Sequence, residues 1–341
     1  MDRRYAERAS VNRTRRRVLL AAGSALAASS FSRPVLAQQW PSKPIRIVAA
    51  QAPGSSNDAT ARALAEFLTT ELKTPVVVEN KPGGLGMIAA DTVARSAPDG
   101  YTLLITLHSQ LAQAPVLLKK APIDPARDLV PVGTFNTGVS LGVVKKDLPV
   151  TNLKELIALS KTRPVSVGNY GVGSGWQMMV MQLAKQTGGQ FDIVTYKGTG
   201  PMALDLMAGN IDMGAGSMVG LAGGIQRGSF KPVVMIQGSR GNPLAPGVPS
   251  WADEGFKGPA FQSLLESNMV LAPRGTPTEV VQRIAELIQK SAHASDKVKA
   301  VLAQLGVTDS PTLTGPALKE FIAQTWPAFQ NMTRELNIVI E

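Results

Sequence analysis

The sequence predicts an α/β protein made of two domains. Short apolar runs typical of buried strands alternate with segments whose apolar residues recur every three or four positions, as on one face of a helix. The alternation occurs in two series, which a proline-broken connection at residues 119–128 separates. A chain of 341 residues is long enough for two domains, each with its own hydrophobic core.

The first unit, at residues 45–72, combines a strand, a loop of small residues and a helix. The strand is expected at 45–50, and apolar residues at helical spacing continue to Leu72. Such a helix start has unpaired backbone N–H groups and a partial positive charge, so it can hold a carboxylate or a phosphate. The alternative is an ordinary capped turn, because the loop also contains three candidate N-caps. The loop residues are Pro53, Gly54, Ser55, Ser56, Asn57 and Asp58, and the last three are those candidates.

Two further units follow the first. A strand at 75–80 leads through a glycine-rich loop into a helix at 87–95. Residues 84–89 match the dinucleotide pattern G-x-G-x-x-A, but no acidic residue follows at the spacing that binds a ribose, so we expect no cofactor there. The loop is instead a candidate neighbour of a ligand. A third strand, at 101–107, ends at His108 and Ser109, and ligands of open α/β sheets collect at that edge.

The second series begins near residue 139 and alternates regularly. Strands are expected at 139–144, 165–170, 191–195, 211–213 and 232–237, and helices at 151–161, 174–187, 200–208 and 217–227. This order predicts parallel pairing through crossover connections. A strand at 263–272 returns the chain, and helices at 277–293, 295–304 and 315–337 close it. We therefore expect domain 1 to contain residues 38–137 plus 263–341, and domain 2 to contain residues 138–262.

The N-terminal segment, residues 1–37, has the pattern of an export signal. Arg15, Arg16 and Arg17 form a twin-arginine motif ahead of a short apolar stretch, and Val35-Leu36-Ala37 supplies a cleavage site. Cleavage after Ala37 leaves 341 − 37 = 304 residues. The apolar stretch is shorter than the roughly 20 residues of a membrane span, so we expect a periplasmic protein exported by the twin-arginine route rather than one held by an anchor helix.

Composition excludes several kinds of function. Eight arginines and two acids in residues 1–37 account for +6 of the formal net charge of +10, and the remaining +4 is too small to predict nucleic-acid binding. The chain has no cysteine, so disulfides and cysteine nucleophiles are excluded. His108 and His293 are far apart and lack acid-rich surroundings, so we expect no metal site.

One pattern fits a hydrolase. Residues 138–142 match G-x-S-x-G, with Ser140 as the nucleophile, and an acid and His293 follow in the order that a hydrolase uses. The motif needs a helix directly after the serine, whereas Val143 and Val144 continue an extended run. We therefore expect no catalysis, and an exported α/β hydrolase stays as the alternative.

Several runs together resemble one family. They span nearly all of the predicted mature chain, and the run PDGYTLL is fairly specific to that family. These runs are WPSKPI at 40–45, VVVENKPG at 76–83, APDGYTLL at 97–104, DP at 124–125, YKG at 196–198, GNID at 209–212, VPS at 248–250 and APRGTP at 272–277. The sequence resembles the Bug (Bordetella uptake gene) family of periplasmic binding proteins, which are receptors of tripartite tricarboxylate transporters.

The resemblance implies a type II periplasmic-binding fold. In this fold, two α/β domains are joined by two crossover strands, and a carboxylated solute lies in the cleft between the domains. The family's carboxylate-binding loops map onto Pro53 to Asn57, onto Gly173, Ser174 and Gly175, and more loosely onto Lys197, Gly198 and Thr199. The rule that ligands collect at strand ends adds His108, Ser109, Gly216 and Ser217. The implied partners are a small carboxylate and membrane transporter subunits, with a signalling sensor as the alternative, and we expect a monomer.

Two departures from the family pattern affect the expected ligand. Ser55 stands where the family usually has glycine, which adds a hydroxyl to the first loop. Trp176 and the two methionines at 178–179 replace a polar pattern after the second loop. If Trp176 lines the cleft, the ligand has an apolar or aromatic body beside its carboxylate; the alternative is that Trp176 packs in the core.

Overall fold

The computed structural model describes residues 40–237, 243–258, 261, 266–307 and 312–336. The twin-arginine segment therefore lies outside the described residues. Lys43–Glu341 forms one compact unit. Within the described ranges, no helix combines the length and the apolar character that crossing a bilayer requires.

The first sheet has six strands and is mixed. Strands β1 and β2 pair in parallel, as do β1 and β3, whereas β10 runs antiparallel to both β3 and β4. The short β11 pairs antiparallel with β4. In spatial order the strands are β11 (Thr312–Leu313), β4 (Leu129–Asn136), β10 (Ser267–Pro273), β3 (Thr102–Leu107), β1 (Ile45–Ala49) and β2 (Val76–Asn80).

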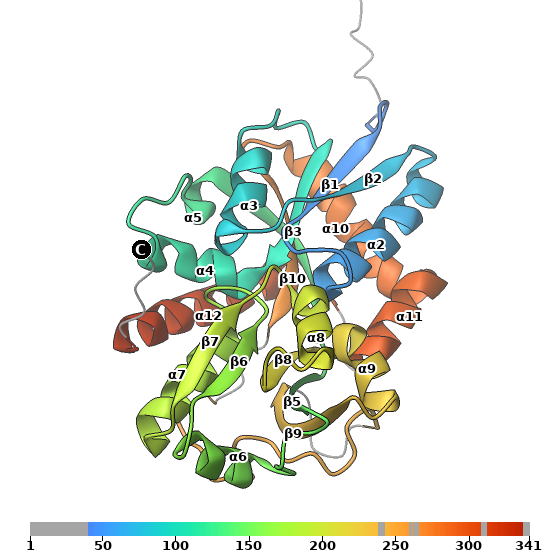
Figure 1. Cartoon of the computed structure of the whole chain (residues 1–341). Coiled ribbons are helices and arrows are strands. Elements are labelled where there is room, and N and C mark those ends of the chain that lie inside the picture. The colour runs from blue at the N-terminus through green and yellow to red at the C-terminus, as the bar shows by residue number, and fades with distance from the viewer. Residues whose placement is uncertain (1–39, 238–242, 259–260, 262–265, 308–311, 337–341) are drawn as a thin grey trace, which may run out of the picture. The chain divides into compact units, whose positions relative to one another are not determined.

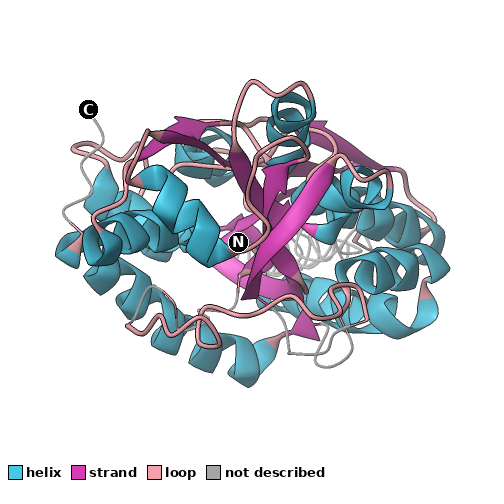
Figure 2. Ribbon diagram, turned by 60° about the horizontal axis from the view of Figure 1, so that its bottom comes forward, coloured by secondary structure: helices cyan, strands magenta, loops and turns pink. Residues whose placement is uncertain are grey.

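Helices surround this sheet (Figures 1 and 2). One core is shared by α3, α4 and α12, whose Met87, Leu111 and Phe329 pack with Val48 of β1 and Met269 of β10. Helices α2, α10 and α11 contact one another. The bounds are α2 (Ser56–Leu72), η1 (Gly84–Gly86), α3 (Met87–Ala94), α4 (His108–Leu117), α5 (Pro125–Asp128), α10 (Thr278–Ala294), α11 (Asp296–Leu305) and α12 (Gly315–Glu335).

The second sheet has five strands and a core on each side. In spatial order the strands are β7 (Phe191–Thr195), β6 (Val165–Asn169), β8 (Met213–Ser217), β5 (Ser140–Lys145) and β9 (Phe230–Gln237). The helices are α6 (Leu153–Ser160), α7 (Gly175–Thr187), α8 (Thr199–Met207) and α9 (Met218–Gln226). Leu156 and Trp176 belong to the core with α6 and α7, and Met202 and Leu221 belong to the core with α8 and α9.

Three expectations about the elements were wrong. The pairing is not all parallel, because β5 runs antiparallel to β8 and β9. Helix α4 was not expected: eight of its ten residues are buried, so it shows no amphipathic pattern. The strand expected at 211–213 is β8 at Met213–Ser217, whose sequence MGAGS lacks the β-branched residues that usually indicate a strand.

Two segments connect the sheets. One joins β4 to β5 through residues 137–139, and the other returns from β9 to β10 and is described again from Glu266. They are hydrogen-bonded together: the Thr137 hydroxyl donates to the Glu266 carbonyl oxygen at 2.7 Å, and the Glu266 N–H donates to Gln237 Oε1 at 2.9 Å. Gly138 has a φ of 62°, and a Cβ there would lie 2.1 Å from the Leu305 carbonyl oxygen, so only glycine fits.

Candidate functional site

A small polar pocket lies where both sheets and the connecting segments meet. Its volume is about 20 Å³. The lining residues are Gln51, Ser56, Leu107, Thr137, Ser140, Tyr170, Thr199, Gly216, Ser217 and Glu266. Most of these residues follow the carboxyl end of a strand, which is where open α/β sheets bind ligands. We call this the polar pocket.

Three helices begin at the polar pocket. Ser56 is the first residue of α2, Thr199 is the first residue of α8, and Ser217 is the N-cap of α9. The N-terminus of a helix carries a partial positive charge and unpaired N–H groups. Ser217 is buried, and its hydroxyl makes no hydrogen bond within the described structure. The pocket therefore offers three helix starts and an unpaired hydroxyl to a small anion, next to the carboxyl of Glu266.

A larger pocket adjoins the polar pocket, with Gln51 and Tyr170 lining both. Its volume is about 210 Å³. The lining residues are Ala50, Gln51, Gly83, Gly84, Leu85, Gly86, Gln110, Tyr170, Gly171, Val172, Thr195, Tyr196 and Lys197. We call it the large pocket. The two pockets are therefore neighbours with a shared wall.

The loops that follow β1 and β7 lie against one another. The Ala52 N–H donates to the Lys197 carbonyl oxygen at 2.8 Å. A Cβ added to Gly200 would lie 2.9 Å from the Pro53 carbonyl oxygen, and one added to Gly198 would lie 3.5 Å from the Ala52 nitrogen. Pro53, Gly54 and Gly198 therefore form a contact between the two loops, and neither pocket is lined by them.

Ser55 and Asp58 hold the first loop in shape. The Ser55 hydroxyl donates to the Ala52 carbonyl oxygen at 2.9 Å and accepts from the Asp58 N–H at 3.2 Å, as an N-cap does. The Asp58 carboxylate accepts from the Gly54 N–H at 3.2 Å and from Asn80 at 2.9 Å. The hydroxyl that was expected to face the ligand is thus used within the loop. None of the three expected residues is the N-cap of α2. The N-cap is Ser55, one residue before the first of them.

Asn57 lines neither pocket. It is fully buried, and its Nδ2 donates to Asn268 Oδ1 at 3.3 Å. Asn268 in turn donates to Thr60 at 3.3 Å. The side chain therefore ties the start of α2 to β10.

The loop at 173–175 is occupied by groups of the protein itself. Gly173 N–H donates to Gln177 Oε1 at 2.8 Å, and Gln113 Nε2 donates to the Gly173 carbonyl oxygen. Ser174 is buried, and its hydroxyl lies 2.6 Å from Asn169 Oδ1 while capping α7. Gly175 N–H donates to Glu266 Oε1 at 3.2 Å. This loop lines neither of the two pockets, although Gly175 lines a smaller third one with Tyr170 and Glu266, and its donors already have partners.

Trp176 lies in the core. Its side chain is fully buried, its indole N–H donates to the Gly168 carbonyl oxygen at 3.1 Å, and its ring lies 6.2 Å from that of Trp251. Of the two interpretations of Trp176, the structure favours the one in which it packs in the core, not the one in which it lines the cleft. The inference of an aromatic ligand from Trp176 loses its basis.

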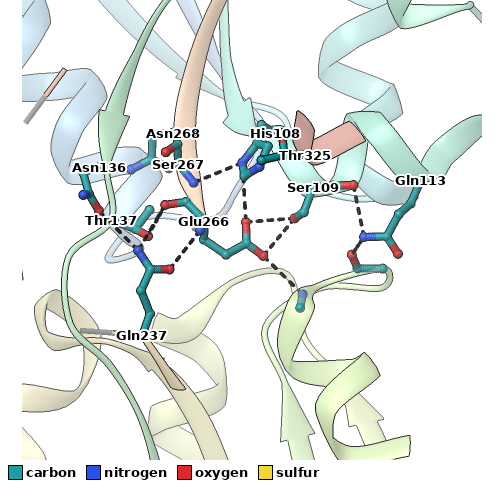
Figure 3. A network of polar contacts seen from close by, with 12 residues as sticks. His108, Ser109, Gln113, Asn136, Thr137, Gln237, Glu266, Ser267, Asn268 and Thr325 are labelled. Carbon is teal, nitrogen blue, oxygen red and sulfur yellow. Dashed lines mark hydrogen bonds and ion pairs between the residues drawn. The ribbon is translucent and has the colours of Figure 1, made fainter. Parts of the chain in front are cut away.

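His108, Ser109 and Glu266 form a buried network behind the polar pocket (Figure 3). The Ser109 hydroxyl lies 2.9 Å from each carboxylate oxygen of Glu266. His108 Nδ1 accepts from the Ser267 N–H at 3.1 Å, and its ring packs against Phe321. His108 and Ser109 were expected to contact the ligand; only Glu266 of the three reaches the pocket.

Burial controls the charge of this network. Burial lowers the pKa of His108 to about 4, so the imidazole is neutral near pH 7. Burial raises the pKa of Glu266 to about 7, although the Gly175 N–H and the Ser109 hydroxyl favour its ionised form. Burial, with the nearby Glu266, also raises the pKa of Tyr170 above its usual range, so its hydroxyl keeps its proton.

Some of the expected site residues line a pocket, and the others line neither of the two pockets. Ser56, Thr199, Gly216 and Ser217 line the polar pocket, and Lys197 lines the large one. Five residues that line the polar pocket were missed, namely Gln51, Leu107, Thr137, Tyr170 and Glu266, and Ser140 had been named only as a nucleophile. Gln51 and Tyr170 closely follow the ends of β1 and β6, so the rule of strand ends could have found them.

The geometry does not favour the hydrolase alternative. Ser140 lies on β5, paired with Ser217 of β8 and Gln237 of β9, and the strand continues beyond it. The strained turn from strand to helix that exposes a nucleophile is absent at this position. Within the described residues, no group of three or more His, Asp or Glu side chains is placed to hold a metal.

Comparisons with known proteins agree with this architecture. The profile of the tripartite tricarboxylate transporter family receptor matches residues 60–337. BugT of Bordetella pertussis is 31% identical over 323 residues, which cover 94% of this chain and 97% of BugT. The periplasmic binding protein BugD superposes with a TM-score of 0.78 at 28% identity, covering 88% of this chain and 99% of BugD.

Two solved relatives carry ligands. A protein of R. palustris with adipate superposes with a TM-score of 0.78 at 26% identity, covering 88% of this chain and 100% of the other. MatC from Rhodopseudomonas palustris with bound malate superposes with a TM-score of 0.75 at 25% identity, covering 86% of this chain and 99% of MatC.

Proposed function

Since this chain belongs to the tripartite tricarboxylate transporter receptor family, with the type II periplasmic-binding fold, we propose that it captures a carboxylated solute in the polar pocket. It then delivers the solute to membrane subunits of a transporter of that type. The family is one of receptors rather than enzymes.

The convergence of three helix N-termini carries this proposal. Ser56, Thr199 and Ser217 bring the starts of α2, α8 and α9 to one pocket, which suits a negative group without any arginine. Ser217 supplies a hydroxyl that is free to donate. The carboxylates bound by two relatives, adipate and malate, support the same chemistry.

The large pocket supports an apolar body for the ligand. Leu85, Val172 and Tyr170 line it beside glycines, so an aliphatic chain would lie against apolar surface there. The body is therefore aliphatic in this proposal, because the tryptophan that suggested an aromatic one is in the core.

The same proposal includes export and a hinged closure. The twin-arginine motif at residues 15–17 supports export by the twin-arginine route. The separate sheets, connected through residues 137–139 and through the segment that ends at Glu266, support division into the two domains expected from the sequence. The contact between the Ala52 and Lys197 loops in this structure supports a closed arrangement, which opening of the hinge would break.

A binding screen tests the proposal. The purified chain is heated with aliphatic monocarboxylates, dicarboxylates and aromatic carboxylates, and hits are measured by calorimetry. A ligand at about a hundred times its dissociation constant stabilises the folded chain by about 2.7 kcal/mol, which a thermal shift detects. Aliphatic carboxylates are expected to stabilise the chain. If no carboxylate does so, the proposal is wrong.

A further inference from the structure

The large pocket contains a buried hydrogen-bond acceptor that the proposed function does not use. Gln110 lies on α4 and is 4% exposed, and it lines the large pocket. Its Nε2 donates to the Val172 carbonyl oxygen at 3.3 Å. A carbonyl oxygen needs a donor, so this contact fixes which end of the amide faces Val172. The other end, Oε1, has no partner within the described structure.

The amide lies between two walls of the large pocket. A Cβ added to Gly171 would lie 2.5 Å from Gln110 Nε2, and one added to Gly86 would lie 3.6 Å from Gln110 Oε1. Both glycines line the pocket. The Thr106 hydroxyl, which is also buried and without a partner in the described structure, lies 2.9 Å from the same Gly86 position. Glycine at these two sites leaves room beside the amide of Gln110, whose Oε1 is itself buried.

We propose that Gln110 Oε1 determines specificity by accepting a hydrogen bond from a hydroxyl at the far end of the solute. This rests on the proposed function, in which the carboxylate end occupies the polar pocket. A buried acceptor left without a donor is unfavourable, so a solute that supplies the donor is preferred over one that does not. The substrate class is therefore an aliphatic hydroxycarboxylate.

Two other chemical groups at the far end of the solute would fit Gln110 less well. A second carboxylate, ionised near pH 7, would be attracted by Lys197, but it has only acceptor oxygens and would face Gln110 Oε1 without a proton between them. An ammonium group would supply a donor. It would, however, be repelled by Lys197, which is the formally charged side chain among the described residues that line the large pocket. A hydroxyl avoids both conflicts.

Gln113 provides a matched control on the same helix. It also donates through Nε2 to a carbonyl of the facing loop, that of Gly173, and it is fully buried. Its Oε1, however, accepts from the Thr333 hydroxyl at 3.0 Å, and neither pocket is lined by it. Substitution of Gln113 therefore removes a contact between α4 and the facing loop without removing an acceptor from the pocket.

The test compares chains of equal length by calorimetry: hexanoate, ω-hydroxyhexanoate and adipate. For the unaltered protein, ω-hydroxyhexanoate is expected to bind about five to ten times more tightly than hexanoate, and more tightly than adipate. In Gln110→Met this preference should disappear, whereas in Gln113→Met it should persist, whatever common change the variant makes to all three affinities.

The outcomes separate the two proposals. If the carboxylates bind and the unaltered protein shows no preference for the hydroxyl, or prefers adipate, the assignment of Gln110 is wrong while the proposed function stands. The same holds if Gln110→Met keeps the preference. If no carboxylate binds to the folded protein, the proposed function itself fails. A missing preference in the unaltered protein overturns the assignment even where a variant does not fold.

Discussion

The backbone N–H of Gly175 donates to Oε1 of Glu266 at 3.2 Å, so a carboxylate of the protein occupies the N-terminus of α7. The family resemblance assigned that position to the carboxylate of the solute. Glu266 reaches it from the segment that leads into β10, and Ser109 on α4 holds the same carboxylate. The helix starts that remain for an external anion at the polar pocket are those of α2, α8 and α9.

Ser217→Ala should weaken solute binding without changing stability. Ser217 lines the polar pocket, and its buried hydroxyl has no partner within the described structure, so its loss removes the proposed hydrogen bond to the solute and none from the fold. We expect affinity to fall about two- to tenfold by calorimetry, with an unchanged melting temperature.

Ser174→Ala is the matched control for that variant. Ser174 caps α7 and is bonded to Asn169, so its loss should lower the free energy of unfolding by about 1 kcal/mol and leave affinity unchanged. If Ser174→Ala weakened binding and Ser217→Ala did not, the assignment of the polar pocket would have to be given up.

Gly200→Ala should hinder the approach of the two loops. Gly200 lies in α8, where alanine is favoured, but its Cβ would lie 2.9 Å from the Pro53 carbonyl oxygen. We expect affinity to fall by about tenfold or more, because the loops must separate, while unfolding stability is retained. Gly223→Ala in α9 is the control, since its Cβ would meet only the Arg227 guanidinium, at 3.4 Å. Equal affinities of the two variants would contradict the role of this contact.

Glu266→Gln should change how stability depends on pH. Glu266 ionises near its usual value of 4.5 when unfolded and near 7 when folded, so between these values the folded chain retains a proton that the unfolded chain has lost. Its contribution to stability therefore falls as pH rises through this window.

The glutamine variant lacks that fall because it does not ionise. Relative to the unaltered protein, it should gain up to about 3 kcal/mol above pH 7 and little below pH 4.5. Urea unfolding at a pH on each side of the window measures the difference. A gain that is the same at both would show that Glu266 does not titrate in this range.

Trp176→Ala should destabilise the chain strongly. The side chain is fully buried beside Trp251, so we expect a loss of about 3–5 kcal/mol in the free energy of unfolding, measured with urea. A small loss of stability together with a large loss of affinity would instead place Trp176 in the binding site.

The sequence predicted the local elements well because they depend on local patterns. Strand β1 and helix α2 follow from apolar periodicity, and the loop between them follows from its glycine and serines. Helix α4 escaped prediction because burial on nearly every side removes the polar face that reveals a helix. The antiparallel pairing of β5 also escaped, because strand direction depends on where the chain crosses between sheets.

By itself, the sequence determined an α/β chain with capped helix starts and a family resemblance that identified its loops. Which loop still has unpaired polar groups to offer a ligand was shown only by the tertiary structure. Ser174 and Ser217 are both N-caps after strands, and only packing shows that Asn169 holds the first hydroxyl while the second is free. The reason is physical: a polar group binds an external anion only if no group of the protein already satisfies it, and Glu266 reaches Gly175 from 91 residues away.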